Sequence, residues 1–171
     1  NNERKNNMGT TRVPAPLTID LGEPSVGFHV AKTSVGQSFA NNVVTQCDYD
    51  TVNFDYGGNI STSNVFTAPV KGIYYFHASI LWTNYTANAG ERADLRIYKN
   101  SSLMSELAEI TIKDDADNFS AFMMQFVNGI LDLDAGNTIE VKAWQSTGVT
   151  QYTYPSSYYN SFMGFCIRQQ V

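Results

Sequence analysis

The longest run of strand-forming residues in the sequence spans residues 66–82, Phe-Thr-Ala-Pro-Val-Lys-Gly-Ile-Tyr-Tyr-Phe-His-Ala-Ser-Ile-Leu-Trp. Proline and glycine disfavour the middle of a strand, so Pro69 and Gly72 predict a strand from about Gly72 to Thr83. Side chains alternate between the two faces of a strand, which puts Tyr74, Phe76, Ala78, Ile80 and Trp82 on one face and Ile73, Tyr75, His77, Ser79 and Leu81 on the other. Both faces carry large apolar groups, so both must be covered, in a two-sheet sandwich or by a second subunit.

Shorter strand-like segments recur along the rest of the chain, separated by Gly, Asn, Asp, Pro and Ser. With the central strand, they lie at about residues 26–32, 50–55, 63–68, 72–83, 91–99, 105–112, 119–128, 137–144 and 160–168. Residues 103–112 would also suit a helix by propensity, but their position between two strands favours a strand. The pattern predicts an all-β protein with about nine or ten strands in two antiparallel sheets.

Length and composition fit a single β-rich domain. The chain has 171 residues, of which 16% are charged and 13% aromatic, including ten Tyr and ten Phe. This balance is typical of an extracellular β domain rather than a helical one. Residues 1–24 are polar and leave little to bury, so we expect a flexible lead-in there and one globular domain over residues 25–171.

The charge pattern argues against two classes of partner. A net charge of −5 without a cluster of Lys or Arg is unsuited to nucleic acid and to an anionic membrane surface. No apolar run approaches the ~18 residues of a membrane-spanning helix, so we expect no membrane insertion.

Catalytic chemistry has few candidates in this sequence. Only two histidines occur, His29 and His77, and both fall inside predicted strands, where a structural role is the better interpretation. The two histidines and two cysteines lack the spacing of zinc ligands, and there is no phosphate loop or dinucleotide fingerprint. We therefore expect no enzymatic activity.

Two segments of the chain resemble a known family. Phe66, Gly72, Tyr74 and Phe76 have the spacing of the core of the complement C1q globular-head signature. Residues 161–167, Ser-Phe-Met-Gly-Phe-Cys-Ile, resemble the Phe-x-Gly-Phe of that family's last strand. Over about residues 25–168 the chain is thus similar to the C1q and tumour-necrosis-factor superfamily, and within it to the stalkless C1q-domain lectins of invertebrates.

The resemblance implies a ten-stranded jelly-roll sandwich that assembles as a homotrimer, each subunit burying aromatic residues of one sheet against its neighbours. Tyr74 and Phe122 are the residues that we expect in this trimer interface. Independently, the apolar residues on both faces of 72–82 and in 119–127 exceed what a one-sided core needs. The alternative is that they line a large core within a single subunit.

Acidic residues in one predicted loop suit a cation. Asp114, Asp115 and Asp117 place three carboxylates within four residues, and calcium needs six to eight oxygen ligands at one place. The resemblance implies calcium at this loop, because calcium-binding C1q relatives take acidic ligands from the corresponding connection. The alternative is an ordinary solvated loop without a metal.

Residues 144–160 are rich in aromatic rings, hydroxyls and amides and carry no charge. Aromatic rings stack on the apolar face of a sugar, and Ser, Thr, Gln and Asn exchange hydrogen bonds with its hydroxyls. We therefore expect a ligand site made by Tyr152, Tyr154, Tyr158 and Tyr159. Tyrosine also suits protein recognition, and Trp144 is expected to pack back into the sandwich instead.

Four sequons for N-linked sugar favour secretion to an extracellular location, with acceptors at Asn59, Asn84, Asn100 and Asn118. Cys47 and Cys166 are too few for a disulfide scaffold. They either pair with each other or remain two buried thiols, and the sequence leaves both alternatives open.

Our leading hypothesis is a secreted, non-enzymatic pattern-recognition protein, a C1q-like lectin that binds carbohydrate on microbial or cell surfaces in innate immunity. It rests on the resemblance, on the uncharged aromatic segment, and on the lack of collagen-like or heptad repeats. The alternative is a ligand of the tumour-necrosis-factor or cerebellin type that binds a receptor protein. A third hypothesis is an extracellular matrix protein, favoured by the acidity and the expected calcium.

Overall fold

The computed structural model describes residues 26–88, 90–111 and 119–170, which form twelve strands and no helix. The strands are β1 (Gly27–Ala31), β2 (Ser38–Phe39), β3 (Thr45–Gln46), β4 (Thr51–Tyr56), β5 (Phe66–Thr67), β6 (Gly72–Ala87), β7 (Arg92–Lys99), β8 (Ser102–Thr111), β9 (Phe119–Leu133), β10 (Thr138–Gln145), β11 (Gln151–Thr153) and β12 (Ser161–Gln169). The all-β prediction is confirmed, and the segment that propensity would allow as a helix is strand β8. In the described part of the chain no helix is long and apolar enough to cross a membrane. The predicted lead-in, residues 1–24, lies outside the described residues.

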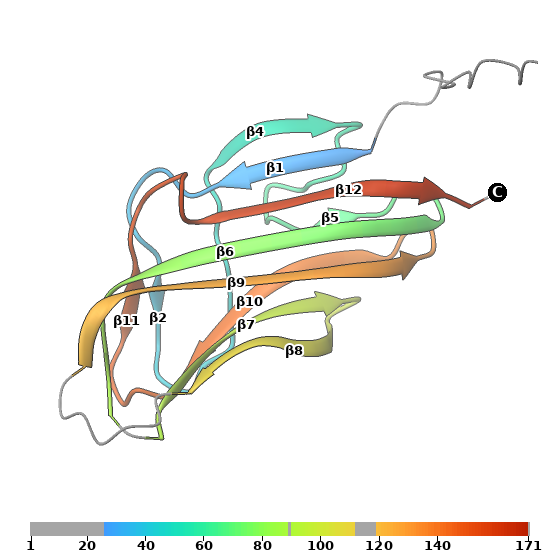
Figure 1. Ribbon diagram of the computed structural model, residues 1–171. Helices are drawn as coiled ribbons and strands as arrows, with labels where there is room; N and C mark the ends of the chain where they lie inside the picture. The colour runs from blue at the N-terminus through green and yellow to red at the C-terminus, as the bar shows by residue number, and fades with distance from the viewer. Residues whose placement is uncertain (1–25, 89, 112–118, 171) are drawn as a thin grey trace, which may run out of the picture.

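The strands form two antiparallel sheets. The first sheet has seven strands, in the order β2, β11, β6, β12, β1, β4, with β9 on the other side of β6. Figure 1 shows its long strands β1, β12, β6 and β9 running side by side. The second sheet has five strands, β3, β10, β7 and β8, with β5 also paired to β10. Strands that are distant in sequence, such as β1 and β12, are therefore neighbours, as a jelly roll requires.

Strand β6 is the axis of the first sheet. It pairs with β9 from Gly72↔Leu133 to Ala87↔Phe119, and its first half also pairs with β12. Its even-numbered side chains from Tyr74 to Trp82 are buried against the second sheet, so its odd-numbered side chains face the opposite way. We call that opposite surface the outer face. It comprises Ile73, Tyr75, His77, Ser79 and Leu81 of β6, Phe122, Met124, Phe126, Asn128 and Ile130 of β9, Met163 and Phe165 of β12, His29 of β1, and Phe54 and Tyr56 of β4.

A cluster of buried aromatic rings joins the two sheets. Phe28 of β1 lies with its ring centroid 4.8 Å from Phe162 of β12 and 5.1 Å from Phe66 of β5. Phe66 belongs to the second sheet and also contacts Phe76 of β6 at 5.3 Å. Each fully buried ring contributes roughly 1.5–3 kcal/mol, so this cluster is a main source of stability.

Two glycines permit the close approach of this cluster. Gly164 is the cross-strand partner of both Phe28 and Phe76, and a Cβ atom at Gly164 would lie 2.5 Å from the Phe76 ring and 2.9 Å from the Phe28 ring. At Gly72, a Cβ atom would lie 2.6 Å from the backbone oxygen of Arg168. Both glycines belong to the segments that resemble the C1q signature. The spacing of those segments thus reflects a steric requirement of the fold.

At the other end of the sandwich, a buried amide ties the sheets together. Trp82 donates its indole N–H to Oε1 of Gln125 at 2.7 Å, and Nε2 of Gln125 donates to the backbone oxygen of Ala93 on β7 at 2.8 Å. Phe39 of β2 packs edge-on against the Trp82 ring at 5.0 Å. The polar groups of the Gln125 side chain are therefore satisfied inside the core, and they fix β9 relative to the second sheet.

The described strands outnumber the ten that the resemblance implies. Strands β2, β3 and β11 have only two or three residues each, too few to show an alternating pattern in the sequence. The predicted strand 63–68 shortens to β5, because the chain turns tightly before it: Asn64 has φ 60° and its N–H donates to the oxygen of Ser61 at 2.9 Å. Strands β6 and β9 instead extend beyond their predicted ends.

The prediction that Tyr74 lies in a subunit interface is wrong. Its side chain has an exposed fraction of 0% within one subunit, and its hydroxyl donates to the backbone oxygen of Val70 at 2.8 Å. Burial raises the pKa of this phenol to about 12. Tyr74 is on the inner face of β6, whereas its neighbour Tyr75 is on the outer face.

The two cysteines are free thiols, so the disulfide alternative is wrong. The backbone N–H of Cys47 donates to Val141 on β10 at 2.9 Å, whereas Cys166 lies on β12 in the other sheet, opposite Tyr74. Burial raises the pKa of the Cys47 thiol to about 12, so this thiol stays protonated and unreactive at neutral pH.

Replacing Gly164 with alanine tests the steric role of the glycine. We expect Gly164→Ala to lower the free energy of unfolding by about 1–3 kcal/mol, because the new methyl group overlaps two buried rings. Gly27→Ala is the matched control. There a Cβ atom would meet its nearest neighbours at 3.5 Å, an ordinary contact. Urea unfolding of both variants measures the difference, and equal stabilities would contradict the steric explanation.

Candidate functional site

The uncharged segment 144–160 is a structured excursion rather than one long loop. Its first part is held by the buried side chain of Gln145, whose amide donates to the backbone oxygens of Phe39 at 3.0 Å and Val149 at 2.8 Å. Oε1 of Gln145 accepts from the N–H of Thr147 at 2.7 Å, and Gln151 donates to the Thr147 hydroxyl at 2.8 Å. This buried network leads the chain into β11, which joins the first sheet beside β6.

Asn160 anchors the second part of the segment to β6. Oδ1 of this buried side chain accepts the backbone N–H of Leu81 at 2.9 Å. Its Nδ2 donates to the backbone oxygens of Tyr154 and Ser156, the latter at 3.3 Å. The N–H of Tyr154 in turn donates to the oxygen of Leu81 at 2.7 Å. One amide side chain therefore closes the turn that carries the tyrosines.

This turn and the outer face together form an aromatic cleft of about 370 Å³, lined by Leu81, Phe122, Tyr154 and Tyr159. The ring of Tyr154 is at the centre, 5.7 Å from Phe122 with an interplanar angle of 83° and 6.5 Å from Tyr159 with an angle of 65°. All three rings remain substantially exposed. The cleft thus presents exposed ring surface with two phenol hydroxyls and no charge among its lining residues.

The structure brings together only two of the four predicted ligand tyrosines. Tyr154 and Tyr159 line the aromatic cleft, whereas Tyr152 lies on β11 opposite Thr83 and Tyr158 is the tip of the turn, 89% exposed. Phe122, which we assigned to the trimer interface from the sequence, also lines the cleft. Nothing in the sequence pairs Phe122 with Tyr154, because 32 positions separate them and their contact depends on the turn that Asn160 closes.

Trp144 does not pack back into the sandwich, contrary to the prediction. It lies on the surface of the second sheet that faces away from the core, partly exposed. The guanidinium groups of Arg92 and Arg96 lie 5.0 and 5.6 Å from its ring centroid. Such contacts contribute roughly 0.5–1 kcal/mol at exposed sites, and they indicate a structural role for this ring.

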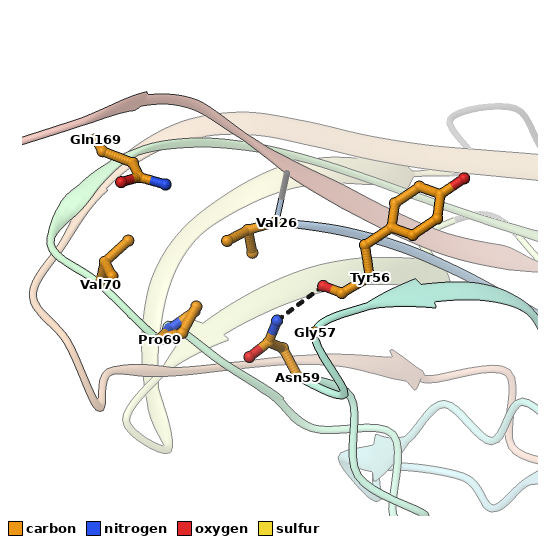
Figure 2. Close-up of a pocket in the computed structure, with 7 residues that line it drawn as sticks. All are labelled: Val26, Tyr56, Gly57, Asn59, Pro69, Val70 and Gln169. Atoms are coloured by element: carbon orange, nitrogen blue, oxygen red, sulfur yellow. Dashed lines mark hydrogen bonds between the residues drawn. The ribbon is translucent and has the colours of Figure 1, made fainter. Parts of the chain in front are cut away.

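A second, smaller cleft of about 180 Å³ lies where the chain enters β1 and leaves β12 (Figure 2). It is lined by Val26, Tyr56, Gly57, Asn59, Pro69, Val70 and Gln169. Figure 2 shows the Asn59 amide directed at the backbone of Tyr56, to whose oxygen it donates at 3.1 Å. The amide stabilises the turn after β4, and no pair of rings faces this cleft. It is the weaker candidate for ligand recognition.

The structure describes some of the predicted glycosylation residues but none of the predicted calcium ligands. Asp114, Asp115, Asp117 and Asn118 lie outside the described residues, so the calcium site stays a prediction. Among the described residues no group of three His, Cys, Asp or Glu is placed to hold a metal. Asn100 is exposed in the β7–β8 turn, and its side-chain oxygen accepts the N–H of Thr138 at 2.9 Å. Asn84 lies on β6, and use of these acceptors stays a prediction.

The charged residues next to β1 have a structural role. The buried amine of Lys32 lies 2.7 Å from Asp48 and 3.4 Å from Asp50. Burial acts to raise the pKa of Asp50, but hydrogen bonds from the hydroxyls and backbone N–H groups of Ser34 and Thr33 outweigh it and lower the pKa below its usual range. These bonds fix the turn after β1, and they leave the carboxylate fully engaged.

Comparison with solved structures identifies the fold. The structure of Eiger TNF from S. frugiperda aligns with a TM-score of 0.65 at 9% identity, over 87% of this chain and 96% of that one. The globular domain of zebrafish complement 1qA protein aligns with a TM-score of 0.59 at 15% identity, over 85% and 99%. Murine APRIL at pH 8.0 aligns with a TM-score of 0.58 at 12% identity, over 84% and 99%. The chain has the C1q/TNF jelly-roll fold.

Neither a protein-family model nor a curated protein matches the sequence. At the identities above, the likeness establishes the C1q/TNF fold but does not identify a ligand. The class of ligand has to be inferred from the surface of the protein. The predicted jelly roll is therefore confirmed, and the aromatic cleft and the outer face are the two surface features that we consider for its function.

Removing the anchor of the turn should loosen the aromatic cleft. We expect Asn160→Ala to lower the free energy of unfolding by about 1–3 kcal/mol, because it leaves the partly buried N–H of Leu81 and the oxygen of Tyr154 without the partner that Asn160 provides. Hydrogen exchange of residues 154–160 should rise more than that of β1. Ser157→Ala is the control in the same turn, since no hydrogen bond of its side chain holds the turn to β6. Unchanged exchange in Asn160→Ala would contradict the anchoring role.

Proposed function

We propose that this protein is an extracellular, non-enzymatic recognition protein, a C1q-like lectin that binds carbohydrate through the aromatic cleft. The observation that carries the proposal is the convergence of Phe122, Tyr154 and Tyr159 around one uncharged concave surface. Exposed aromatic rings bind the apolar face of a pyranose, and the phenol hydroxyls can exchange hydrogen bonds with its hydroxyl groups. The volume of about 370 Å³ is within the range of small-ligand sites and accommodates one or two sugar rings.

The proposed role in innate immunity would combine a weak site with several copies of it. A single shallow cleft gives modest affinity for a sugar. Several clefts on one assembly would bind a repetitive microbial surface together, and the overall affinity then rises by avidity. Recognition of a surface polymer therefore suits this protein better than capture of a free monosaccharide.

The outer face supports assembly of several copies of the chain. Its exposed apolar side chains are Phe54, Tyr56, Phe122, Met124, Phe126, Ile130 and Phe165. A contiguous apolar surface of this kind is unusual on a monomer and typical of a protein interface. The face offers little charge for an unlike partner to complement, so we take a second copy as its occupant, within the homotrimer that the C1q resemblance implies.

A ligand of the tumour-necrosis-factor type is the alternative function. It is favoured by the alignment with Eiger TNF and APRIL, which is as extensive as that with the C1q domain. Tyr152 and Tyr158 are exposed outside the cleft and would suit contact with a receptor protein. In both functions the protein is secreted, and calcium at Asp114, Asp115 and Asp117 would contribute stability rather than catalysis.

Substitutions in the cleft test the lectin proposal. We expect Tyr154→Ala or Tyr159→Ala to weaken binding to the preferred sugar on a glycan array by about fivefold each, since loss of one ring contact costs about 1 kcal/mol. Tyr158→Ala is the matched control, because its ring is exposed and lines neither cleft. The melting temperatures of the variants should remain close to that of the unaltered protein.

Two results would contradict this proposal. Full glycan binding by the Tyr154→Ala, Tyr159→Ala double variant would place recognition elsewhere. A flat array, together with a cell-surface protein recovered by cross-linking through Tyr152 or Tyr158, would support the receptor-ligand alternative.

A charge on the outer face tests assembly. We expect Phe126→Glu to convert the assembled protein to a folded monomer, because an unpaired carboxylate buried in an interface costs several kcal/mol. Phe126 is 59% exposed in one subunit and does not line the aromatic cleft, so the substitution removes no lining residue of the cleft. Val149→Glu, a similar change on a loop outside the outer face, should leave assembly intact. Sedimentation velocity checks both variants, and a monomeric unaltered protein would refute assembly.

A further inference from the structure

The two histidines of the chain lie in one transverse row on the outer face. Met163 of β12 is the cross-strand partner of His29 on β1 and of His77 on β6. Phe54 of β4 extends the row beyond His29, and Asn128 of β9 extends it beyond His77. Adjacent strands are about 4.8 Å apart, so the two histidine backbones are about 10 Å apart with one thioether between them. The two histidines are far apart in the sequence, at positions 29 and 77, and the strand order brings them close together.

The surroundings of His29 disfavour its protonated form. Its Nδ1 is 3.1 Å from Nδ2 of Asn53, so the neutral ring accepts a hydrogen bond there. Its Nε2 is buried without a hydrogen-bond partner among the described residues, and its ring packs edge-on against Phe54 at 6.0 Å. A second proton on this imidazole would oppose two donors at Nδ1 and would be poorly hydrated. Burial lowers the pKa of His29 accordingly.

His77 is in a similar apolar position. Its ring stacks on Phe126 with centroids 6.4 Å apart and an interplanar angle of 24°. Met163 and Asn128 flank it on the neighbouring strands, and neither can titrate. Burial lowers the pKa of His77 as well, although the ring is still partly exposed in a single subunit. Covering the outer face would remove the water that remains.

No carboxylate faces either histidine from the described elements packed against it. β4 contributes Asn53 and Phe54, β12 contributes Met163, and β9 contributes Phe126 and Asn128. The other titratable groups on or beside the described outer face are Tyr56, Tyr75, the cleft residues Tyr154 and Tyr159, and Asp132 and Arg168 beside Ile73 at its far end. An imidazolium in this row would therefore have no counter-ion among the described residues of its own subunit.

We propose that the row His29, Met163, His77 makes association through the outer face pH-dependent, so that copies assemble at neutral pH and separate under mildly acidic conditions. This inference rests on the proposed assembly and adds its regulation. A second copy seated on the row removes water from two imidazoles and so favours their neutral forms. Association then requires neutral histidines. It is fully present above the pKa of the free chain and weakens as the pH falls through that value.

The size of the effect follows from proton linkage. Each histidine that must lose a proton on assembly weakens association by up to about tenfold per pH unit below its pKa in the free chain. Two histidines in each chain act in the same direction, so the dependence should be steep. One pH unit below the pKa that both histidines have in the free chain, assembly should therefore be weaker by up to about a hundredfold for each chain that joins.

Sedimentation of the unaltered chain and of the variant carrying His29→Gln and His77→Gln tests the inference, each at pH 8.0 and pH 5.5. The measured quantity is the ratio of the association constants at the two pH values, which does not depend on how strongly the variant assembles at pH 8.0. We expect a large ratio for the unaltered chain and a ratio close to one for the variant. The single variants should be intermediate. Near-ultraviolet circular dichroism at pH 5.5 should show that the separated chains remain folded.

The outcomes separate the two proposals. An unaltered protein that is monomeric at both pH values would refute assembly itself, and with it the pH dependence. Assembly that is equally strong at both pH values would refute the pH dependence alone. If the doubly substituted variant lost as much association between pH 8.0 and pH 5.5 as the unaltered chain does, the pH dependence would also be refuted. The responsible groups would then be titratable groups other than the two histidines.

Discussion

The structure depends on one constraint, which is that strand β6 is apolar on both faces and the described part of the chain covers only one of them. The second sheet covers the inner face through the ring cluster of Phe28, Phe66, Phe76 and Phe162. The outer face has no second layer among the described residues, and its exposed rings remain in contact with water. Removing apolar surface of this extent from water lowers the free energy. The proposed assembly therefore depends on the same strand that organises the fold.

The fold requires few specific residues, which explains how it can be shared at 9–15% identity. Alternation along the strands supplies the core, and many apolar residues satisfy it equally well. Gly164 and Gly72 are different, because any larger side chain would overlap a ring or a backbone oxygen. These positions are where the resemblance to the C1q signature is found. A signature can thus persist at points of close approach while the surrounding sequence diverges.

The sequence was sufficient to predict the positions of the long strands. It was insufficient to predict which face of a strand packs against the second sheet. β6, β9 and β12 show clear alternation, whereas β2, β3 and β11 are too short to show any. Tyr74 was assigned to the wrong face because periodicity separates two faces without saying which one meets the second sheet. Likewise, composition correctly marks residues 144–160 as aromatic and uncharged, but the pairing of Tyr154 with Phe122 requires a turn closed by one buried amide. Tertiary contacts decide such cases.

The aromatic cleft and the outer face are not independent surfaces. Leu81 and Phe122 belong to both, so a copy seated on the outer face lies beside the cleft. Occupancy of one surface must then change the affinity of the other, and by linkage the effect is the same in both directions. If a neighbouring copy completes the wall of the cleft, ligand binding strengthens assembly. If the neighbouring copy instead covers Phe122, the ligand and the neighbouring copy compete for the same surface. The sign of this coupling distinguishes a site shared between subunits from one that each subunit carries alone.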